Sequence, residues 1–167
     1  MNIAVINSWD EAEATASFHR CCGSSRWSKE MAQHRPFPSE AALLEAADRI
    51  WWGLPGTDWL EAFAAHPTIG ARGPMQPQHA ATAAWSAGEQ SGTQRAAPEV
   101  LRALADANQQ YETRFGYIFI VCATGKSADE MLALLNRRLS HSPDDEIKLA
   151  AAEQAKITRI RLEKIAP

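Results

Sequence analysis

Apolar residues recur at steps of three and four along most of the chain, which predicts a succession of amphipathic helices. Residues at this spacing share one face of a helix, and that face packs against the rest of the protein. The pattern therefore predicts an all-α fold, a multi-helix bundle in which Trp51 and Trp52 belong to the core. The clearest stripe follows Ser39 and consists of Leu43, Leu44, Ala47, Ile50, Trp51 and Leu54.

Residues that start and stop helices stand between these stripes. Ser, Thr and Asp accept hydrogen bonds from the free amides of a first helical turn, proline fits the first helical position, and glycine ends helices. We expect Gly23 to end the first helix, residues 78–85 to form a short helix, and residues 86–92 to be a loop. The predicted helix starts are Ser8 with Glu11, Ser24 or Ser25, Ser39, Thr57, Pro98, Ser127 with Glu130, and Ser142 before Pro143.

One segment, residues 117–123, departs from the helical pattern. It is a short run of β-branched, aromatic and small residues, which predicts a buried extended segment, and no partner strand is evident. Its buried backbone N–H and C=O groups need hydrogen-bond partners. Two sources of partners are open at this point: neighbouring side chains or water on one hand, and a polar ligand on the other.

Length and charge narrow the class of protein. The chain has 167 residues, for which one domain (1–167) with one core is the expectation. A formal net charge of -3 gives no overall attraction to nucleic acid, and no apolar run is long enough to cross a membrane. Three cysteines, two of them adjacent, do not form a disulfide framework. We expect a cytoplasmic protein without a nucleic-acid or membrane partner.

The first candidate for chemistry is His66, which is followed by Pro67 and a loop rich in Gly and Pro. Proline disfavours helix for the residue before it, so the helix that begins near Thr57 should end at His66. The last carbonyls of a helix favour a protonated ring, and such a histidine can exchange protons with a ligand near neutral pH. The alternative is that His66 merely caps the helix. The loop 71–77 is long enough to border or cover a pocket, or is plain surface.

Three other motifs give weaker evidence for a functional site. Residues 123–127 resemble the end of a phosphate-binding loop, but Ile120 stands where that motif needs glycine. The histidines and cysteines show no spacing typical of a metal site, and we expect no metal. Cys122 is more typical of a buried structural thiol than of a nucleophile activated by His66.

Several stretches, taken together in their order and spacing, resemble the 2-oxo-4-hydroxy-4-carboxy-5-ureidoimidazoline (OHCU) decarboxylases of the urate-to-allantoin pathway. The resemblance covers essentially the whole chain. It implies an all-α fold, a homodimer, no cofactor, and conversion of OHCU to (S)-allantoin as the last step of urate oxidation. The stretches are Cys22-Gly23-Ser24-Ser25-Arg26-Trp27, His66-Pro67-Thr68-Ile69-Gly70, Ser86-Ala87-Gly88-Glu89-Gln90, Phe115-Gly116-Tyr117-Ile118-Phe119-Ile120-Val121 and Lys156-Ile157-Thr158-Arg159-Ile160-Arg161-Leu162.

The resemblance also implies roles for individual residues. His66 would be the catalytic residue that delivers a proton or polarises the hydroxyl and carboxylate, and Glu89 would orient it or hold the ureido N–H groups. Arg161 is the candidate for binding the carboxylate, for which the planar guanidinium is suited; the alternative is a surface ion pair. Further substrate contacts are implied for Pro67, Ser86, Gln90, Phe119, Ile120, Val121, Cys122 and Ala123.

A second hypothesis comes from a different class of protein. The same fold without catalysis would be a helical binding or regulatory domain, whose last helix (residues 156–164) docks an acidic partner. The presence of His66, Glu89 and Gln90 together favours the enzyme, because a scaffold does not need these three polar residues in loop contexts.

Overall fold

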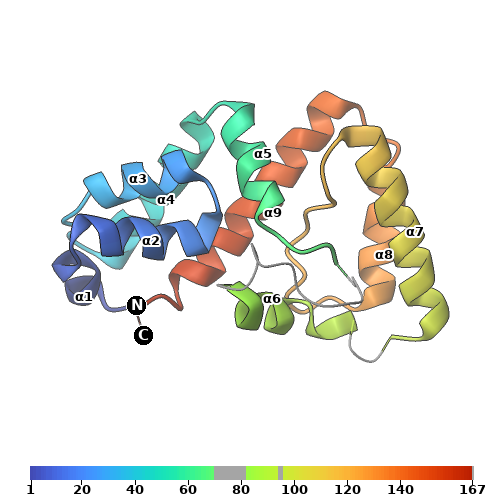
Figure 1. The fold of residues 1–167 in the computed structure, drawn as a ribbon, viewed down its shortest axis with the longest axis horizontal. Helices are drawn as coiled ribbons and strands as arrows, with labels where there is room; N and C mark the ends of the chain where they lie inside the picture. Colours follow the sequence, from blue (N-terminus) through green and yellow to red (C-terminus); the bar gives the residue numbers. More distant parts are fainter. Residues whose placement is uncertain (70–81, 94–95, 167) are drawn as a thin grey trace. The chain divides into compact units, whose positions relative to one another are not determined.

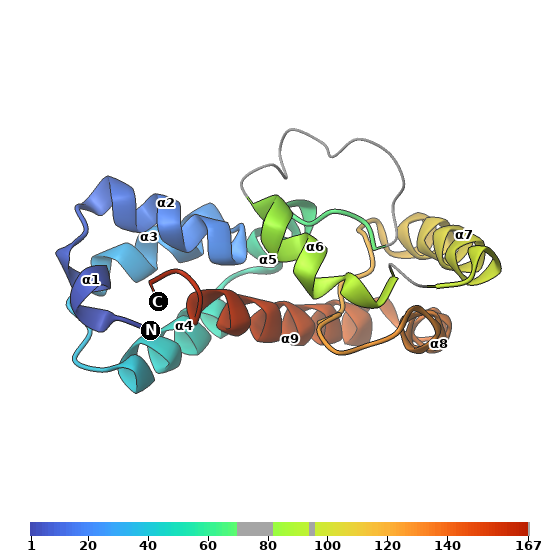
Figure 2. The same cartoon turned by 90° about the horizontal axis from the view of Figure 1, so that it is seen from below.

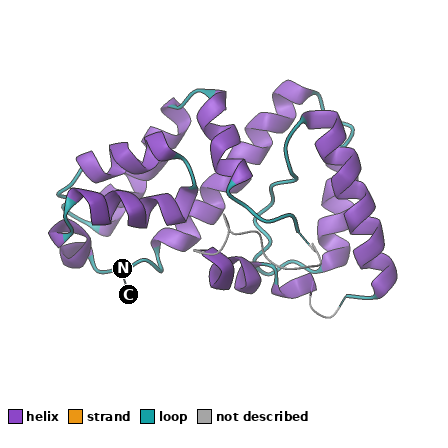
Figure 3. Ribbon diagram, in the orientation of Figure 1, coloured by secondary structure: helices purple, strands orange, loops and turns teal. Residues whose placement is uncertain are grey.

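The computed structural model of the chain describes residues 1–69, 82–93 and 96–166 (Figure 1). Within these ranges it contains helices and no strand (Figure 3), which confirms the prediction of an all-α fold. The predicted loop 71–77 and the first part of the predicted helix 78–85 lie outside the described residues. The helices are α1 (Ile3–Ser8), α2 (Glu11–Cys22), α3 (Ser25–Gln33), α4 (Glu40–Gly53), α5 (Gly56–Ala64), α6 (Ala83–Glu89), the short 3-10 helix η2 (Ser91–Thr93), α7 (Pro98–Phe115), α8 (Ala128–Arg138) and α9 (Pro143–Leu162).

The chain divides into two compact units. The first unit consists of Met1–Ala62 and Gln154–Pro167, and the second unit is Phe63–Glu153. α5 and α9 each contribute residues to both units. Of the site residues predicted from the sequence, Arg161 belongs to the first unit and the others belong to the second.

In the first unit α2 packs along α3, and α3 packs against α4 (Figure 2). Buried aromatic side chains contact one another in the core of this unit. Phe18 contacts Trp27 and Phe37 edge to face, with ring centroids 6.1 and 6.3 Å apart. The indole N–H of Trp27 donates to the carbonyl of Ala47 at 3.0 Å, so the polar atom of this buried ring is satisfied. Burying one large apolar side chain stabilises the fold by about 1.5–3 kcal/mol.

The helix starts of the first unit confirm the predicted caps at Ser24 and Ser39 and correct those at Ser8 and Thr57, the latter because α5 begins at Gly56. Ser24 and Ser39 accept hydrogen bonds from the amides three residues ahead, as predicted, and Gly23 ends α2 in the left-handed conformation with φ 87°. The predicted cap at Ser8 is wrong. Ser8 ends α1 and donates to the carbonyl of Val5, whereas the carboxylate of Asp10 accepts the amide of Glu13 at 2.7 Å. α1 is only six residues long, too short for a clear apolar period.

The two adjacent tryptophans of α4 have different surroundings. Trp51 is 2 % exposed and belongs to the core, whereas Trp52 is 49 % exposed, so the prediction that both are buried is wrong for Trp52. Successive helical residues do not face the same way, so one side of the helix cannot bury both rings. Trp52 instead contacts Trp59 edge to face, with ring centroids 5.8 Å apart.

In the second unit α7 and α8 pack against each other, and the chain between them passes through the shared core (Figure 1). α7 ends at Gly116, which has φ 80°, a conformation that glycine adopts without strain. Residues 119–123 then run without regular structure, and each is 8 % exposed or less. This confirms a buried, non-helical segment for residues 119–123, whereas Tyr117 and Ile118, which the prediction included, are only half-buried. The core around it contains Ile69, Leu104, Ala107, Tyr111, Phe119, Val121, Ala123, Met131 and Leu135.

None of the helices in the described ranges is long and apolar enough to cross a membrane.

Candidate active site

His66 lies in a turn directly after α5. The helix ends at Ala64, two residues earlier than predicted, and the backbone N–H of His66 donates to the carbonyl of Phe63 at 3.1 Å. The imidazole and the neighbouring Pro67 are half-buried. Proline lacks an N–H and restricts the residue before it, which is why the helix does not continue through this turn. A half-buried histidine on such a turn can reach both a bound ligand and solvent protons.

The chain after His66 is anchored from the interior by Asn108. The amide nitrogen of this buried α7 side chain donates to the carbonyl of Ile69 at 3.2 Å and to that of Leu104 at 2.9 Å. The first of these bonds joins residues 39 positions apart in sequence. Asn108 therefore fixes the chain three residues beyond His66 to the helical core of the second unit.

Ser86, Glu89 and Gln90 share one side of α6. The predicted loop 86–92 is wrong for its first part, because α6 extends from Ala83 to Glu89 and Gln90 caps its end. Gly88 suggested a loop, but a glycine within a helix costs only about 1 kcal/mol relative to alanine, so packing can override it. Ser86 and Glu89 are 4 % and 8 % exposed, and residues three and four apart face the same way. The helix thus presents a buried hydroxyl and carboxyl group on its inner face.

Charged side chains hold the backbone of the extended segment. The carbonyl of Ile120 accepts a hydrogen bond from Arg138 Nη1 at 2.7 Å, and the amide of Cys122 donates to Glu153 Oε2 at 2.8 Å. The carbonyl of Cys122 accepts from Lys126 Nζ at 2.7 Å. Side chains therefore supply partners for these groups, which is one of the two sources left open by the sequence.

The other edge of the segment is different. In an extended chain, successive residues direct their N–H and C=O groups to opposite edges. Ile120 and Cys122 point to the edge held by charged side chains. Within the described part of the chain, the backbone groups of Phe119 and Val121 have no protein hydrogen-bond partner. Buried backbone groups of this kind are suited to binding a polar planar ligand.

The short helix η2, which follows α6, contacts the loop between the extended segment and α8. A Cβ atom placed on Gly92 would lie 1.9 Å from the carbonyl oxygen of Lys126, so only glycine fits at this position. This close approach brings the chain that follows Glu89 and Gln90 against the loop whose lysine holds Cys122. The chain two residues beyond Gln90 therefore lies against the loop three residues beyond Ala123.

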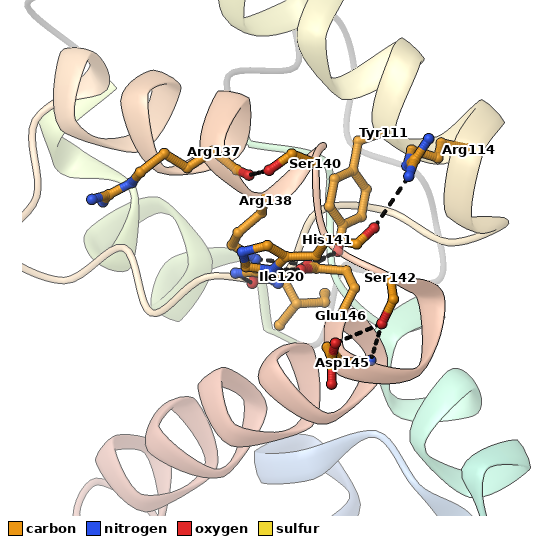
Figure 4. Close-up of polar contacts among 10 residues, drawn as sticks. All are labelled: Tyr111, Arg114, Ile120, Arg137, Arg138, Ser140, His141, Ser142, Asp145 and Glu146. Carbon is orange, nitrogen blue, oxygen red and sulfur yellow. Dashed lines mark hydrogen bonds and ion pairs between the residues drawn. The ribbon is translucent and has the colours of Figure 1, made fainter.

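A buried polar cluster lies behind the extended segment (Figure 4). Glu146 is fully buried, and one of its oxygens accepts from Arg138 Nε at 2.7 Å and from the hydroxyl of Tyr111. Its other oxygen contacts Nδ1 of His141 at 2.8 Å. Burial, together with the hydrogen bond to Glu146, raises the pKa of Tyr111 well above its ordinary value, so Tyr111 remains a donor at neutral pH.

Arg161 lies near the end of α9 in the first unit. It is 2 % exposed, so the alternative of a surface ion pair is wrong. Its charge acts on the two adjacent cysteines: burial raises the pKa of Cys22 to about 12, and Arg161 lowers it in part. These thiols are protonated at neutral pH and are no nucleophiles. The role of Arg161 as the carboxylate ligand stays a prediction.

The residues that hold this region were not predicted from the sequence. Arg138, Glu146 and Asn108 lie on the core-facing stripes of their helices, where apolar residues are expected. Arg138 follows Met131 and Leu135 at steps of four and three, and both are fully buried. A charged or amide side chain in phase with an apolar stripe is therefore the pattern that could have identified them.

Within the described part of the chain, no three His, Cys, Asp or Glu side chains gather closely enough to hold a metal ion. What the second unit does contain is polar groups of three kinds: the half-buried His66, the buried carboxyl group of Glu89 and the buried backbone of residues 119–123. Polar groups of these kinds, carried by an all-α fold, are typical of proteins that bind a small polar molecule.

The comparisons with known proteins agree with a protein that binds a small polar molecule, and they identify the family of the chain. The family model described as OHCU decarboxylase matches residues 7–163, and the chain belongs to that family. It is 42% identical over 147 residues to the uric acid degradation bifunctional protein TTL of Arabidopsis thaliana, covering 87% of this chain but only 45% of that protein. It is 28% identical to an OHCU decarboxylase of Haloferax volcanii, covering 97% of this chain and 94% of the relative.

A solved structure is similar over nearly the same length. The crystal structure of an OHCU decarboxylase in the presence of (S)-allantoin matches with a TM-score of 0.76 and 36% identity, covering 93% of this chain and 97% of that one. The chain therefore shares both the fold and a substantial part of the sequence of a family member.

Proposed function

We propose that the chain catalyses the decarboxylation of OHCU to (S)-allantoin, the last step of urate oxidation, without a cofactor. The observation that carries this proposal is the similarity, over 93% of the chain, to an OHCU decarboxylase whose structure was solved with (S)-allantoin. The polar groups of the second unit, on the turn after α5, on α6 and along the extended segment, are of the kinds that this chemistry needs.

The substrate supplies its own electron sink. The bond to the carboxylate carbon breaks, CO₂ leaves, and the bonding pair forms a double bond within the ring, while the nitrogen of the neighbouring imine takes up a proton. A proton is then added to the ring carbon that carries the ureido group, while the hydroxyl group becomes a carbonyl. The protein needs to anchor the substrate, supply a proton and restrict its delivery to one face.

His66 is the residue that we assign to proton transfer, because it is half-buried and lies on the turn between α5 and the anchored Ile69. Glu89 orients it or holds the ureido N–H groups, for which a buried carboxyl group is suited. Ser86 and Gln90, on the same side of α6, add polar contacts, and Pro67 shapes the wall beside the imidazole.

The extended segment binds the flat, urea-like edges of the substrate in this proposal. Phe119 and Val121 offer backbone N–H and C=O groups on the edge that carries no side-chain partner within the described residues. Ile120, Cys122 and Ala123 complete the segment, and their buried side chains exclude water from it. Arg161 binds the substrate carboxylate with its guanidinium group.

The assembly and the location of the protein belong to the same proposal. The active form is a homodimer, and its place is the cytoplasm. The latter is supported by three free and buried cysteines, which fit a reducing compartment.

The test is the decay of freshly prepared OHCU, followed with and without the protein, before and after exhaustive dialysis against a chelator. We expect decay well above the buffer rate in both protein samples. Decay at the buffer rate would contradict the enzymatic function and favour a binding domain. Activity that vanishes on chelation and returns only with added metal would contradict the cofactor-free mechanism.

A further inference from the structure

The guanidinium group of Arg138 joins the buried polar cluster to the extended segment (Figure 4). Nε and Nη2 both approach the same oxygen of Glu146, while Nη1 donates to the carbonyl of Ile120 at 2.7 Å. The guanidinium carbon also lies 4.7 Å from the centroid of the Phe119 ring, within the range of a cation–π contact. One side chain thus fixes two successive residues of the segment.

Glu146 in turn fixes the guanidinium. The carboxyl group is fully buried, and its oxygens also contact the hydroxyl of Tyr111 and Nδ1 of His141, so it is held from α7 and from the turn before α9. The planar guanidinium can present Nη1 in only one direction once Nε and Nη2 are bound. The Ile120 carbonyl is therefore held at a defined place by a rigid donor.

We infer that Arg138, fixed by Glu146, is a positioning residue for the decarboxylation: it holds Phe119 and Ile120 so that the opposite backbone edge faces the substrate. The inference rests on the proposed function. A buried ion pair contributes little net stability compared with apolar side chains of similar volume, so stability alone does not account for the pair. What the pair does supply is a fixed orientation of the segment.

The experiment separates orientation from stability with two variants. Arg138→Met removes the donor to Ile120 but leaves Glu146 buried without its cation, so the melting temperature falls. Arg138→Met with Glu146→Gln removes both charges and keeps an acceptor for Tyr111, so much of the lost melting temperature returns. Neither variant can hold the Ile120 carbonyl.

We expect kcat/KM to stay about 10- to 100-fold below wild type in the double variant, the loss that one hydrogen bond from a charged donor implies. The larger part of the loss should appear as a higher KM, because the backbone contacts exist both before and during the chemical step. The kcat/KM of Arg138→Lys should lie between those of the wild type and the double variant, since an ammonium group reaches only one partner at a time. Arg137→Met, at the exposed neighbouring position of α8, is the matched control and should change neither quantity.

A double variant that regains both melting temperature and kcat/KM would overturn the inference and leave Arg138 a stability residue. A wild-type KM for Arg138→Lys would also overturn the inference. This second comparison tests the inference even if the double variant does not fold. Hydrogen exchange gives a readout that does not depend on turnover: the peptide 117–126 should exchange faster in the double variant than in wild type. If the wild type is active but the peptide exchanges equally fast in the double variant and the wild type, the positioning role is contradicted. If the wild type is inactive but the peptide exchanges faster in the double variant, the proposed function is contradicted and the positioning role is not.

Discussion

The helix starts of the first unit and the extended segment of the second unit are held in different ways. Asp10, Ser24 and Ser39 each accept the amide three residues ahead, so the partner is local in sequence. The carbonyl of Ile120 and the amide of Cys122 are held by side chains 18 and 31 positions away, and only the carbonyl of Cys122 has a nearby partner, Lys126. Local rules therefore specify the helices, whereas the irregular backbone proposed to bind substrate depends on the assembled fold. Changes in the two regions should affect different quantities.

The largest effect is expected in the second unit, for His66→Asn. Removing the proton-transfer group should lower kcat by about 10² to 10⁴, or roughly 3 to 5 kcal/mol of barrier, because this is the usual contribution of general acid–base catalysis. The fold should persist, since His66 lies in a turn. Steady-state kinetics and circular dichroism check both points. A folded variant that retains more than about a tenth of the wild-type kcat would remove His66 from the chemical step.

Glu89→Gln should reduce turnover and binding by less than the change at His66. The amide keeps an acceptor but loses the charge that orients the imidazole or holds the ureido N–H groups. Because both residues are proposed to serve one proton path, the double variant should lose far less than the product of the two single losses. The measurement is kcat and KM for both singles and the double. Strictly multiplicative losses would show that the two residues act independently.

Gly92→Ala tests the contact between η2 and the loop that follows the extended segment. The new Cβ would overlap the carbonyl oxygen of Lys126, so the two backbone segments must move apart, which costs about 1–3 kcal/mol of folding stability. We expect a lower melting temperature together with a higher KM. Gly88→Ala is the matched control, because a Cβ at that helical position meets nothing within 4 Å, and it should stabilise by up to about 1 kcal/mol. Equal behaviour of the two variants would show that the contact at Gly92 does not matter.

The smallest effect is expected at the helix caps of the first unit. Ser39→Ala removes the acceptor for the amide of Ala42 and should lower the free energy of unfolding by about 1 kcal/mol. Because Ser39 is not among the proposed site residues, kcat and KM should stay unchanged well below the melting temperature. Denaturant unfolding and steady-state kinetics on the same sample provide the check. A changed KM would mean that the helix caps of the first unit affect substrate binding as well as stability.

The helix starts and the extended segment also differ in how well the sequence predicts them. The helices and the caps at Ser24, Ser39 and Ser127 could be predicted because partner and helix are adjacent in the chain. The buried segment was predictable as well, since its composition does not fit a helix. Its partners were not, because no local pattern tells which distant side chain will face Ile120 or Cys122. The helical position of Glu89 was missed because Gly88 is a weak helix former and tertiary packing decided its conformation.

The most direct test of the proposed reaction is the product formed from fresh OHCU in D₂O. NMR measures deuterium at the ring carbon that carries the ureido group, and circular dichroism measures the handedness of the allantoin. If the protein delivers the proton to one face, the product is the deuterated (S)-enantiomer, formed faster than in buffer alone. Racemic allantoin that forms at the buffer rate would contradict the account.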